Sequence, residues 1–97
     1  MDARTELLVI MMEECGELIQ ACSKALRKNE FEDNRNLIEE VGDVYTMIEI
    51  MHSFDLISWN DIEKRVQEKR VKLSEWSQLL ENWEVEEDQW EAEDRLR

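Results

Sequence analysis

The chain is 97 residues long and contains no proline and only two glycines. β-Sandwiches, barrels and meanders need glycine, proline and Asn-Gly pairs for their many tight turns, so this composition nearly excludes them. It suits helices instead, and we predict an all-α fold. Two glycines are also too few for the glycine-rich loops of P-loop and Rossmann nucleotide sites. A single histidine, His52, argues against a histidine-based zinc or haem site.

The balance of charges is strongly acidic. With 25 acids against 12 bases, the net charge is −13 when the histidine is neutral. Such a surface repels the phosphate backbones of DNA and RNA at long range, so we expect no nucleic-acid polymer as a partner. It attracts divalent cations, which can in turn bind phosphates.

The two cysteines, Cys15 and Cys22, are predicted to be free thiols. Seven residues apart on one helix, they lie about 10 Å from each other, which is too far for a disulfide. Free thiols indicate a reducing compartment. The N-terminal residues do not resemble a signal peptide, and no apolar run approaches the roughly 20 residues of a membrane span. We therefore expect a cytoplasmic protein with no membrane partner.

Apolar residues at helical spacing predict three helices. The first covers residues 3–28 and begins at Asp2 or Thr5 as its cap. A short polar connection, residues 29–33, follows it, and Asp33 is the expected N-cap of the second helix. Because the connection is short, the first two helices should be antiparallel neighbours.

The second helix is predicted to run to about Phe54. Ser58 and Asp61 resemble a capping box that opens the third helix. In chain order, the three apolar stripes are Leu7, Met11, Cys15, Leu18, Cys22 and Ala25; Leu37, Val41, Val44, Ile48 and Met51; Ile62, Val66, Leu73, Trp76 and Leu80.

The last seventeen residues have a different composition, with eight acids, two bases and two tryptophans. We therefore divide the chain into a domain over 1–80 and an acidic extension over 81–97. Trp76, Trp83 and Trp90 follow a strict spacing of seven. This pattern fits either a frayed acidic tail or a heptad seam that packs on a partner subunit. The cost of exposing tryptophan slightly favours the seam.

Four carboxylates are predicted to lie where amphipathic helices normally carry leucine. At about 100° per residue, Glu14 projects inside the apolar face of the first helix and Glu17 projects at its edge. Glu40 and Asp43 take the same places on the second helix. A buried, unpaired carboxylate is costly, so these acids need a compensating charge. Mg²⁺ and Mn²⁺ prefer carboxylate oxygens, and a metal ion is the natural candidate.

The four acids belong to a repeated motif, which reads EECGE at 13–17 and EEVGD at 39–43. An i,i+3 spacing places both acids of each pair on one side of a helix. In an antiparallel hairpin that turns near residue 31, the motifs lie within roughly two turns of the same height, which permits one shared metal site. Gly16 and Gly42 each cost about 1 kcal/mol in mid-helix, and we expect a close helix approach to compensate.

This pattern, E-E-x-x-E and then E-x-x-D on the next helix, resembles the all-α nucleoside triphosphate pyrophosphohydrolases, which include MazG and the dimeric dUTPases. The motif residues are Glu13, Glu14, Glu17, Glu40 and Asp43, with 22 residues between the two halves. The surrounding sequence is most similar to short MazG-like proteins, especially phage-encoded ones. The likeness covers residues 5 to about 78.

The resemblance implies an enzyme that hydrolyses an NTP or dNTP to the monophosphate and pyrophosphate. It implies that Mg²⁺ or Mn²⁺ is held by Glu14, Glu17, Glu40 and Asp43, with Glu13 catalytic but farther from the ion. It also implies a homodimer, or a homotetramer built from two dimers, in which antiparallel helices form a four-helix-bundle core. The phage-type likeness favours a guanine deoxynucleotide and, for a phage-encoded chain, a place in phage nucleotide metabolism in the host cytoplasm.

Some basic residues are candidates for binding the substrate's phosphates. Lys24 follows Glu17 by seven residues on the same side of the helix, so it can meet phosphate oxygens. A lysine that is simply solvated and contacts no substrate explains Lys24 equally well. Arg27 and Lys28 are weaker candidates.

A second group of cations, Arg65, Lys69 and Lys72, forms a basic stripe on the third helix. This stripe could flank a triphosphate. Salt bridges to Glu68, to Glu75 or to acids of another subunit explain it equally well.

An alternative to an enzyme is a non-catalytic acidic helical protein that binds a partner through its tryptophan heptad. Four acids on the apolar arcs of two consecutive helices favour the enzyme. Metal-dependent release of pyrophosphate from an NTP would separate the two hypotheses.

Overall fold

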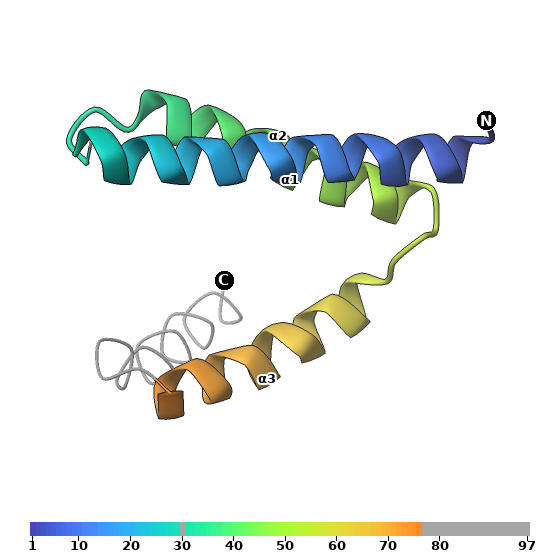
Figure 1. Cartoon of the computed structure of the whole chain (residues 1–97). Coiled ribbons are helices and arrows are strands. Elements are labelled where there is room, and N and C mark those ends of the chain that lie inside the picture. Colours follow the sequence, from blue (N-terminus) through green and yellow to red (C-terminus); the bar gives the residue numbers. More distant parts are fainter. Residues whose placement is uncertain (30, 77–97) are drawn as a thin grey trace, which may run out of the picture. The chain divides into compact units, whose positions relative to one another are not determined.

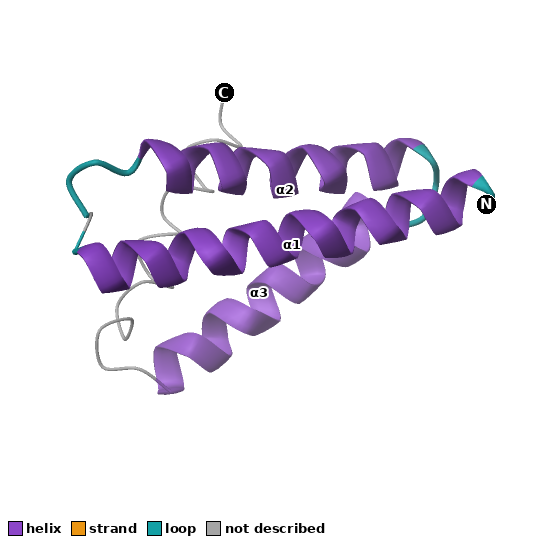
Figure 2. Cartoon of the chain, turned by 45° about the horizontal axis from the view of Figure 1, so that its top comes forward, coloured by secondary structure: helices purple, strands orange, loops and turns teal. Residues whose placement is uncertain are grey.

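The structure is a computed structural model that describes residues 1–29 and 31–76. Within these ranges the chain forms helices and no strand, which confirms the predicted all-α class (Figures 1 and 2). The helices are α1 (Ala3–Lys28), α2 (Arg35–Ser53) and α3 (Trp59–Trp76). The chain divides into two compact units, one formed by Met1–Ile57 and the other containing α3.

Helix α1 has a defined cap at each end. Its N-cap is Asp2, whose side chain accepts a hydrogen bond from the backbone N–H of Thr5 at 2.8 Å. At the other end Asn29 adopts a left-handed conformation with φ 54°, and its N–H donates to the carbonyl of Ala25. Asparagine tolerates this conformation better than most residues. The predicted range of the first helix is confirmed.

The prediction that Asp33 caps α2 is wrong. The N-cap is Asn34, and its side chain makes no capping hydrogen bond. The Asp33 carboxylate instead accepts two hydrogen bonds from the Arg35 guanidinium, both at 2.9 Å. The Asp33 carboxylate therefore binds the Arg35 guanidinium through two hydrogen bonds and does not cap the helix.

Helices α1 and α2 lie side by side and antiparallel, as the short connection between them predicts (Figures 1 and 2). The most buried apolar side chains are Ala21, 4% exposed, and Met47, 6% exposed. Most of the residues in the two predicted stripes are half-buried, but Cys22 and Val41 are exposed. The contact between two helices covers a narrower arc than these predicted stripes.

Helix α1 carries a second row of apolar side chains on its exposed surface. Leu8, Met12, Ile19 and Leu26 are 47%, 67%, 69% and 72% exposed, respectively. Their spacing of four and seven residues keeps them on one side of the helix, and we call them the outer stripe. None of these residues belongs to the stripes predicted from the sequence. A contiguous exposed apolar row of this kind is typical of an interaction surface.

The two mid-helix glycines are not sites of close helix approach. A Cβ atom added at Gly16 or Gly42 would meet no heavy atom within 4 Å among the neighbouring groups of the described chain. Both residues are exposed. The expectation that close packing compensates their cost is therefore wrong for the described structure, because both glycines lie away from the α1–α2 contact.

Helix α3 begins directly after Ser58, whose carbonyl accepts a hydrogen bond from the N–H of Ile62. Trp76, at its last position, is 83% exposed. The other two residues of the predicted tryptophan heptad, Trp83 and Trp90, lie outside the described residues, as does the extension over 81–97. Among the described helices, none combines the length and the apolar character that a membrane span requires.

Candidate functional site

Four carboxylates converge on the α1–α2 hairpin. Glu14 and Glu17 come from α1, and Glu40 and Asp43 come from α2. Each offers one carboxylate oxygen, and these four oxygens all lie within 4.8 Å of one another. We call these four residues the acid cluster. The structure thus brings together the two acid pairs that the sequence places on separate helices.

The helical spacing explains how each acid is placed. Glu14 and Glu40 are half-buried, whereas Glu17 and Asp43 are exposed. This order agrees with the helical projection, which puts the first two inside the apolar faces and the other two at the edges. The i,i+3 spacing keeps each pair on one side of its helix. The register of the antiparallel hairpin then sets the two pairs against each other.

The two inner carboxylates have an unfavourable environment when they are ionised. The Oε2 atoms of Glu14 and Glu40 are buried, and neither has a hydrogen-bond partner among the described residues. Burial raises the pKa of Glu14 above its ordinary value, and the charges of Glu17 and Asp43 raise this pKa further. Burial also raises the pKa of Glu40, again with Glu17 and Asp43 adding to the effect. The cluster therefore favours any process that neutralises its charge.

A divalent cation fits this set of donor atoms. All four side chains offer carboxylate oxygens, which hard cations such as Mg²⁺ and Mn²⁺ prefer. The buried oxygens of Glu14 and Glu40 would gain the partner that they lack. Because Glu17 and Asp43 are exposed, the ion would stay open to solvent on one side. Magnesium sites in proteins usually keep such an open side for water or for substrate phosphates.

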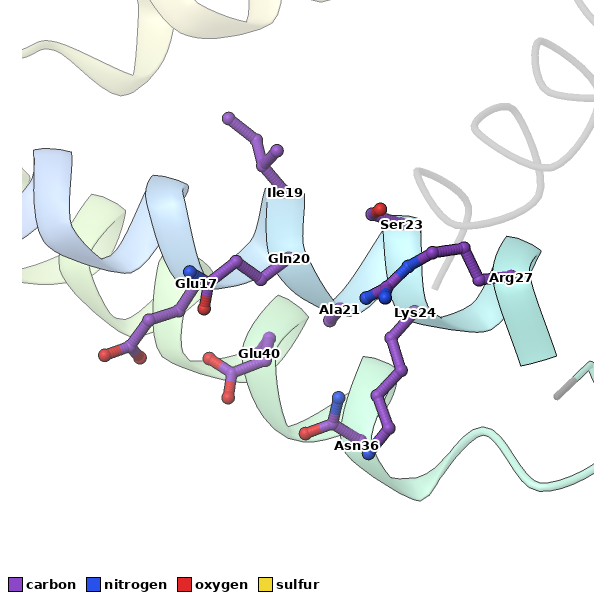
Figure 3. A pocket seen from close by; sticks show the side chains of 9 residues that line it. All are labelled: Glu17, Ile19, Gln20, Ala21, Ser23, Lys24, Arg27, Asn36 and Glu40. Carbon is purple, nitrogen blue, oxygen red and sulfur yellow. The ribbon is translucent and has the colours of Figure 1, made fainter.

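A groove of about 700 Å³ adjoins the acid cluster and shares Glu17 and Glu40 with it (Figure 3). Lys24 lines the groove farther along α1. In Figure 3 its side chain extends from α1 toward Asn36, in the first turn of α2. The remaining lining residues are Ile19, Gln20, Ala21, Ser23 and Arg27. The lysine predicted to meet phosphates thus lines the same groove as two acids of the cluster.

A family model described as the MazG nucleotide pyrophosphohydrolase domain matches residues 3–75. The match covers α1, α2 and all but the last residue of α3. The chain belongs to the MazG family. The resemblance inferred from the two acid motifs is thereby confirmed. Searches of the curated proteins and of the solved structures gave no match.

The MazG family comprises nucleotide pyrophosphohydrolases that typically depend on divalent metal ions. In this MazG domain the acid cluster is a group that could bind such an ion. Glu13, the remaining acid of the motif, is exposed and is not one of the four converging carboxylates. Its charge contributes to the raised pKa of Glu14. The structure therefore separates Glu13 from the acid cluster.

The basic stripe of the MazG domain lies on α3. Arg65, Lys69 and Lys72 are all exposed. The guanidinium of Arg65 donates a hydrogen bond to the Glu68 carboxylate at 3.3 Å, which is one of the salt bridges considered from the sequence. Contact between this stripe and a substrate stays a prediction.

Two residues that the sequence did not single out, or ranked low, line the groove. Arg27 follows Lys24 by three residues, and Asn36 enters from α2. Asn36 precedes Glu40 by four residues, a spacing that places both on one side of the helix. That spacing is a signal that the sequence does contain. Arg27 has a signal of the same kind, because its i,i+3 spacing from Lys24 places both residues on one side of α1.

Proposed function

We propose that this MazG domain is a divalent-metal-dependent nucleoside triphosphate pyrophosphohydrolase. It would convert an NTP or dNTP and water to the monophosphate and pyrophosphate. The main support is the convergence of four carboxylates from two helices beside a groove lined by Lys24. Membership of the MazG family supports the same class of reaction.

The proposed chemistry requires a bound cation and an open path for the substrate. The water oxygen bonds to the α-phosphorus, and the bond from this phosphorus to the α,β-bridging oxygen breaks. The bridging oxygen leaves with pyrophosphate, and the monophosphate keeps the oxygen of the water, with release of one proton. A divalent cation would neutralise phosphate charge and lower the pKa of the attacking water.

The residues of the chain would bind the metal ion and the phosphates of the substrate. Glu14 and Glu40 would hold the ion against the hairpin, while Glu17 and Asp43 would complete its ligands on the open side. Lys24 would donate charge-assisted hydrogen bonds to phosphate oxygens in the groove. Arg65, Lys69 and Lys72 are proposed as further phosphate contacts.

We also propose that the chain functions as a homodimer or as a homotetramer built from two dimers. The support is the outer stripe of α1, which leaves four large apolar side chains exposed. Pairing two α1–α2 hairpins would give a four-helix core and would remove this surface from water.

The test of the activity is a panel of all common NTPs and dNTPs, with dGTP included, incubated with the purified chain and Mg²⁺ or Mn²⁺. Ion-exchange chromatography should show monophosphate and pyrophosphate in equal amounts from at least one nucleotide. A chelator should abolish both products. If the panel gives neither product, or gives orthophosphate alone, the proposal is wrong and a non-catalytic acidic interaction protein becomes the better account.

A further inference from the structure

The groove beside the acid cluster has two ends of opposite charge (Figure 3). Glu17 and Glu40 form the acidic end. Lys24, Arg27 and Asn36 lie toward the α1–α2 connection. In Figure 3 the Arg27 side chain runs back along α1, so that its guanidinium points toward the acidic end of the groove. Long helical side chains favour this direction, toward the N-terminus of their own helix.

Both cations also have simpler explanations. Arg27 lies in the last turn of α1, where a positive charge interacts favourably with the helix dipole. Hydrogen bonds from Arg35 lower the pKa of Asp33, and the charge of Lys24 adds a smaller effect in the same direction. Lys28 occupies the same last turn as Arg27 but is not among the groove-lining residues. A comparison of Arg27 with Lys28 therefore separates a role in the groove from a role at the helix end.

We propose that Arg27, Asn36 and Lys24 form a seat for the β- and γ-phosphates of the substrate. This inference rests on the proposed function and assigns each phosphate of the substrate to one end of the groove. The α-phosphate would lie at the acid cluster, the rest of the polyphosphate would extend toward the α1–α2 connection, and pyrophosphate would form in the seat. Arginine suits this position because its planar guanidinium donates two parallel hydrogen bonds to phosphate oxygens. The seat would select triphosphates over diphosphates.

The first test compares Arg27→Gln with the matched control Lys28→Gln. Both changes remove one positive charge from the same turn of α1 and keep a good helix former. Calorimetry with inorganic pyrophosphate and Mg²⁺ measures the seat without any turnover. Arg27→Gln should weaken pyrophosphate binding about tenfold or more, which is the loss expected for a charge-assisted hydrogen bond. Lys28→Gln should bind as the unmodified chain does.

The second test, Asn36→Asp, distinguishes a loss of phosphate binding from a loss of folding. The substitution should raise stability and lower affinity for phosphates. Helix α2 has no acidic residue in its first turn, so a negative charge there should raise the melting temperature through the helix dipole. The same charge should repel the terminal phosphates, raise KM for the triphosphate and weaken pyrophosphate binding. A variant that gains stability and loses affinity cannot owe its defect to unfolding.

The outcomes distinguish this proposal from the proposed function. If the unmodified chain hydrolyses triphosphates but Arg27→Gln and Asn36→Asp keep its KM and its affinity for pyrophosphate, the seat is wrong and the enzyme stands. If no nucleotide is hydrolysed but pyrophosphate binds and both variants weaken it, the seat stands and the activity is wrong. Failure of the unmodified chain to bind pyrophosphate with Mg²⁺ would overturn the seat.

Discussion

Glu17 and Glu40 belong both to the acid cluster and to the groove, so they are the most informative single residues. Glu17→Gln and Glu40→Gln each remove one charged ligand and nearly conserve volume. We expect each to lower turnover by orders of magnitude and to leave the helical circular dichroism signal intact. Glu39→Gln is the control, because Glu39 is exposed, adjoins Glu40 and lies outside the acid cluster. Near-normal turnover in both cluster variants would rule out the site.

The raised pKa values of Glu14 and Glu40 predict how the metal-free protein responds to pH. A carboxyl group with a raised pKa contributes stability below its ordinary value of 4.5, and this contribution is lost as the pH rises through the folded-state pKa. With a chelator present, the melting temperature should therefore fall as the pH rises from about 4.5 toward neutrality. Glu14→Gln and Glu40→Gln should each flatten this slope and melt higher near pH 7.

Two other carboxyl groups set the lower limit of that experiment. Hydrogen bonds lower the pKa of Asp2, through Thr5, and that of Asp33, through Arg35. Their contribution is lost as the pH falls below 3.8, so the scan should stay above that value. At pH values above this limit, added Mg²⁺ should make the melting temperature rise with pH instead of fall, because a bound cation favours the ionised acid cluster. A melting temperature that rises with pH in the chelated protein would contradict the assigned electrostatics.

At the scale of the helices, substitutions at Gly16 and Gly42 test whether another surface packs against the exposed sides of α1 and α2. A Cβ at either position enters open space in the described chain, so Gly16→Ala and Gly42→Ala should each stabilise it by about 0.5–1 kcal/mol. Thermal melts should show a rise of several degrees for each variant. An unchanged or lower melting temperature would mean that another surface packs against the glycines in solution.

The helices and the face that each acid occupies could be predicted from the sequence. Helical spacing alone determines these faces, and Glu14 and Glu40 are half-buried where the projection places them. The register between α1 and α2 could be predicted only to within roughly two turns, because periodicity along one helix does not show where its neighbour lies. The i,i+4 spacing of Asn36 and Glu40 places both on one side of α2, but it does not show that Asn36 lines the same groove as Lys24.

The capping of α2 shows a second limit of reasoning from sequence. Asp33 and Asn34 are both good N-cap residues, and propensity does not choose between them. The choice depends on Arg35, whose guanidinium binds the Asp33 carboxylate. Competition between side chains for one acceptor is a property of the folded geometry, which a propensity scale does not contain.

At the scale of the whole molecule, the outer stripe predicts association. Light scattering at micromolar concentration should give the mass of at least two 11.7 kDa chains. The double substitution Leu8→Glu and Leu26→Glu should reduce this mass, because it buries charge in the proposed interface. Phe31→Glu is the control, since Phe31 is exposed on the α1–α2 connection and lies off the stripe. A folded, active monomer would contradict the proposed assembly.

Isotope labelling can show whether water attacks the α-phosphorus of a nucleotide at the acid cluster. The purified chain is incubated in ¹⁸O-water with Mg²⁺ and its best substrate from the panel, and the products are analysed by mass spectrometry. We expect one ¹⁸O atom in the nucleoside monophosphate and none in the pyrophosphate. Glu17→Gln and Glu40→Gln should form almost no labelled product. Label in pyrophosphate or in orthophosphate, with an unlabelled nucleotide product, would show that water attacks a different phosphorus.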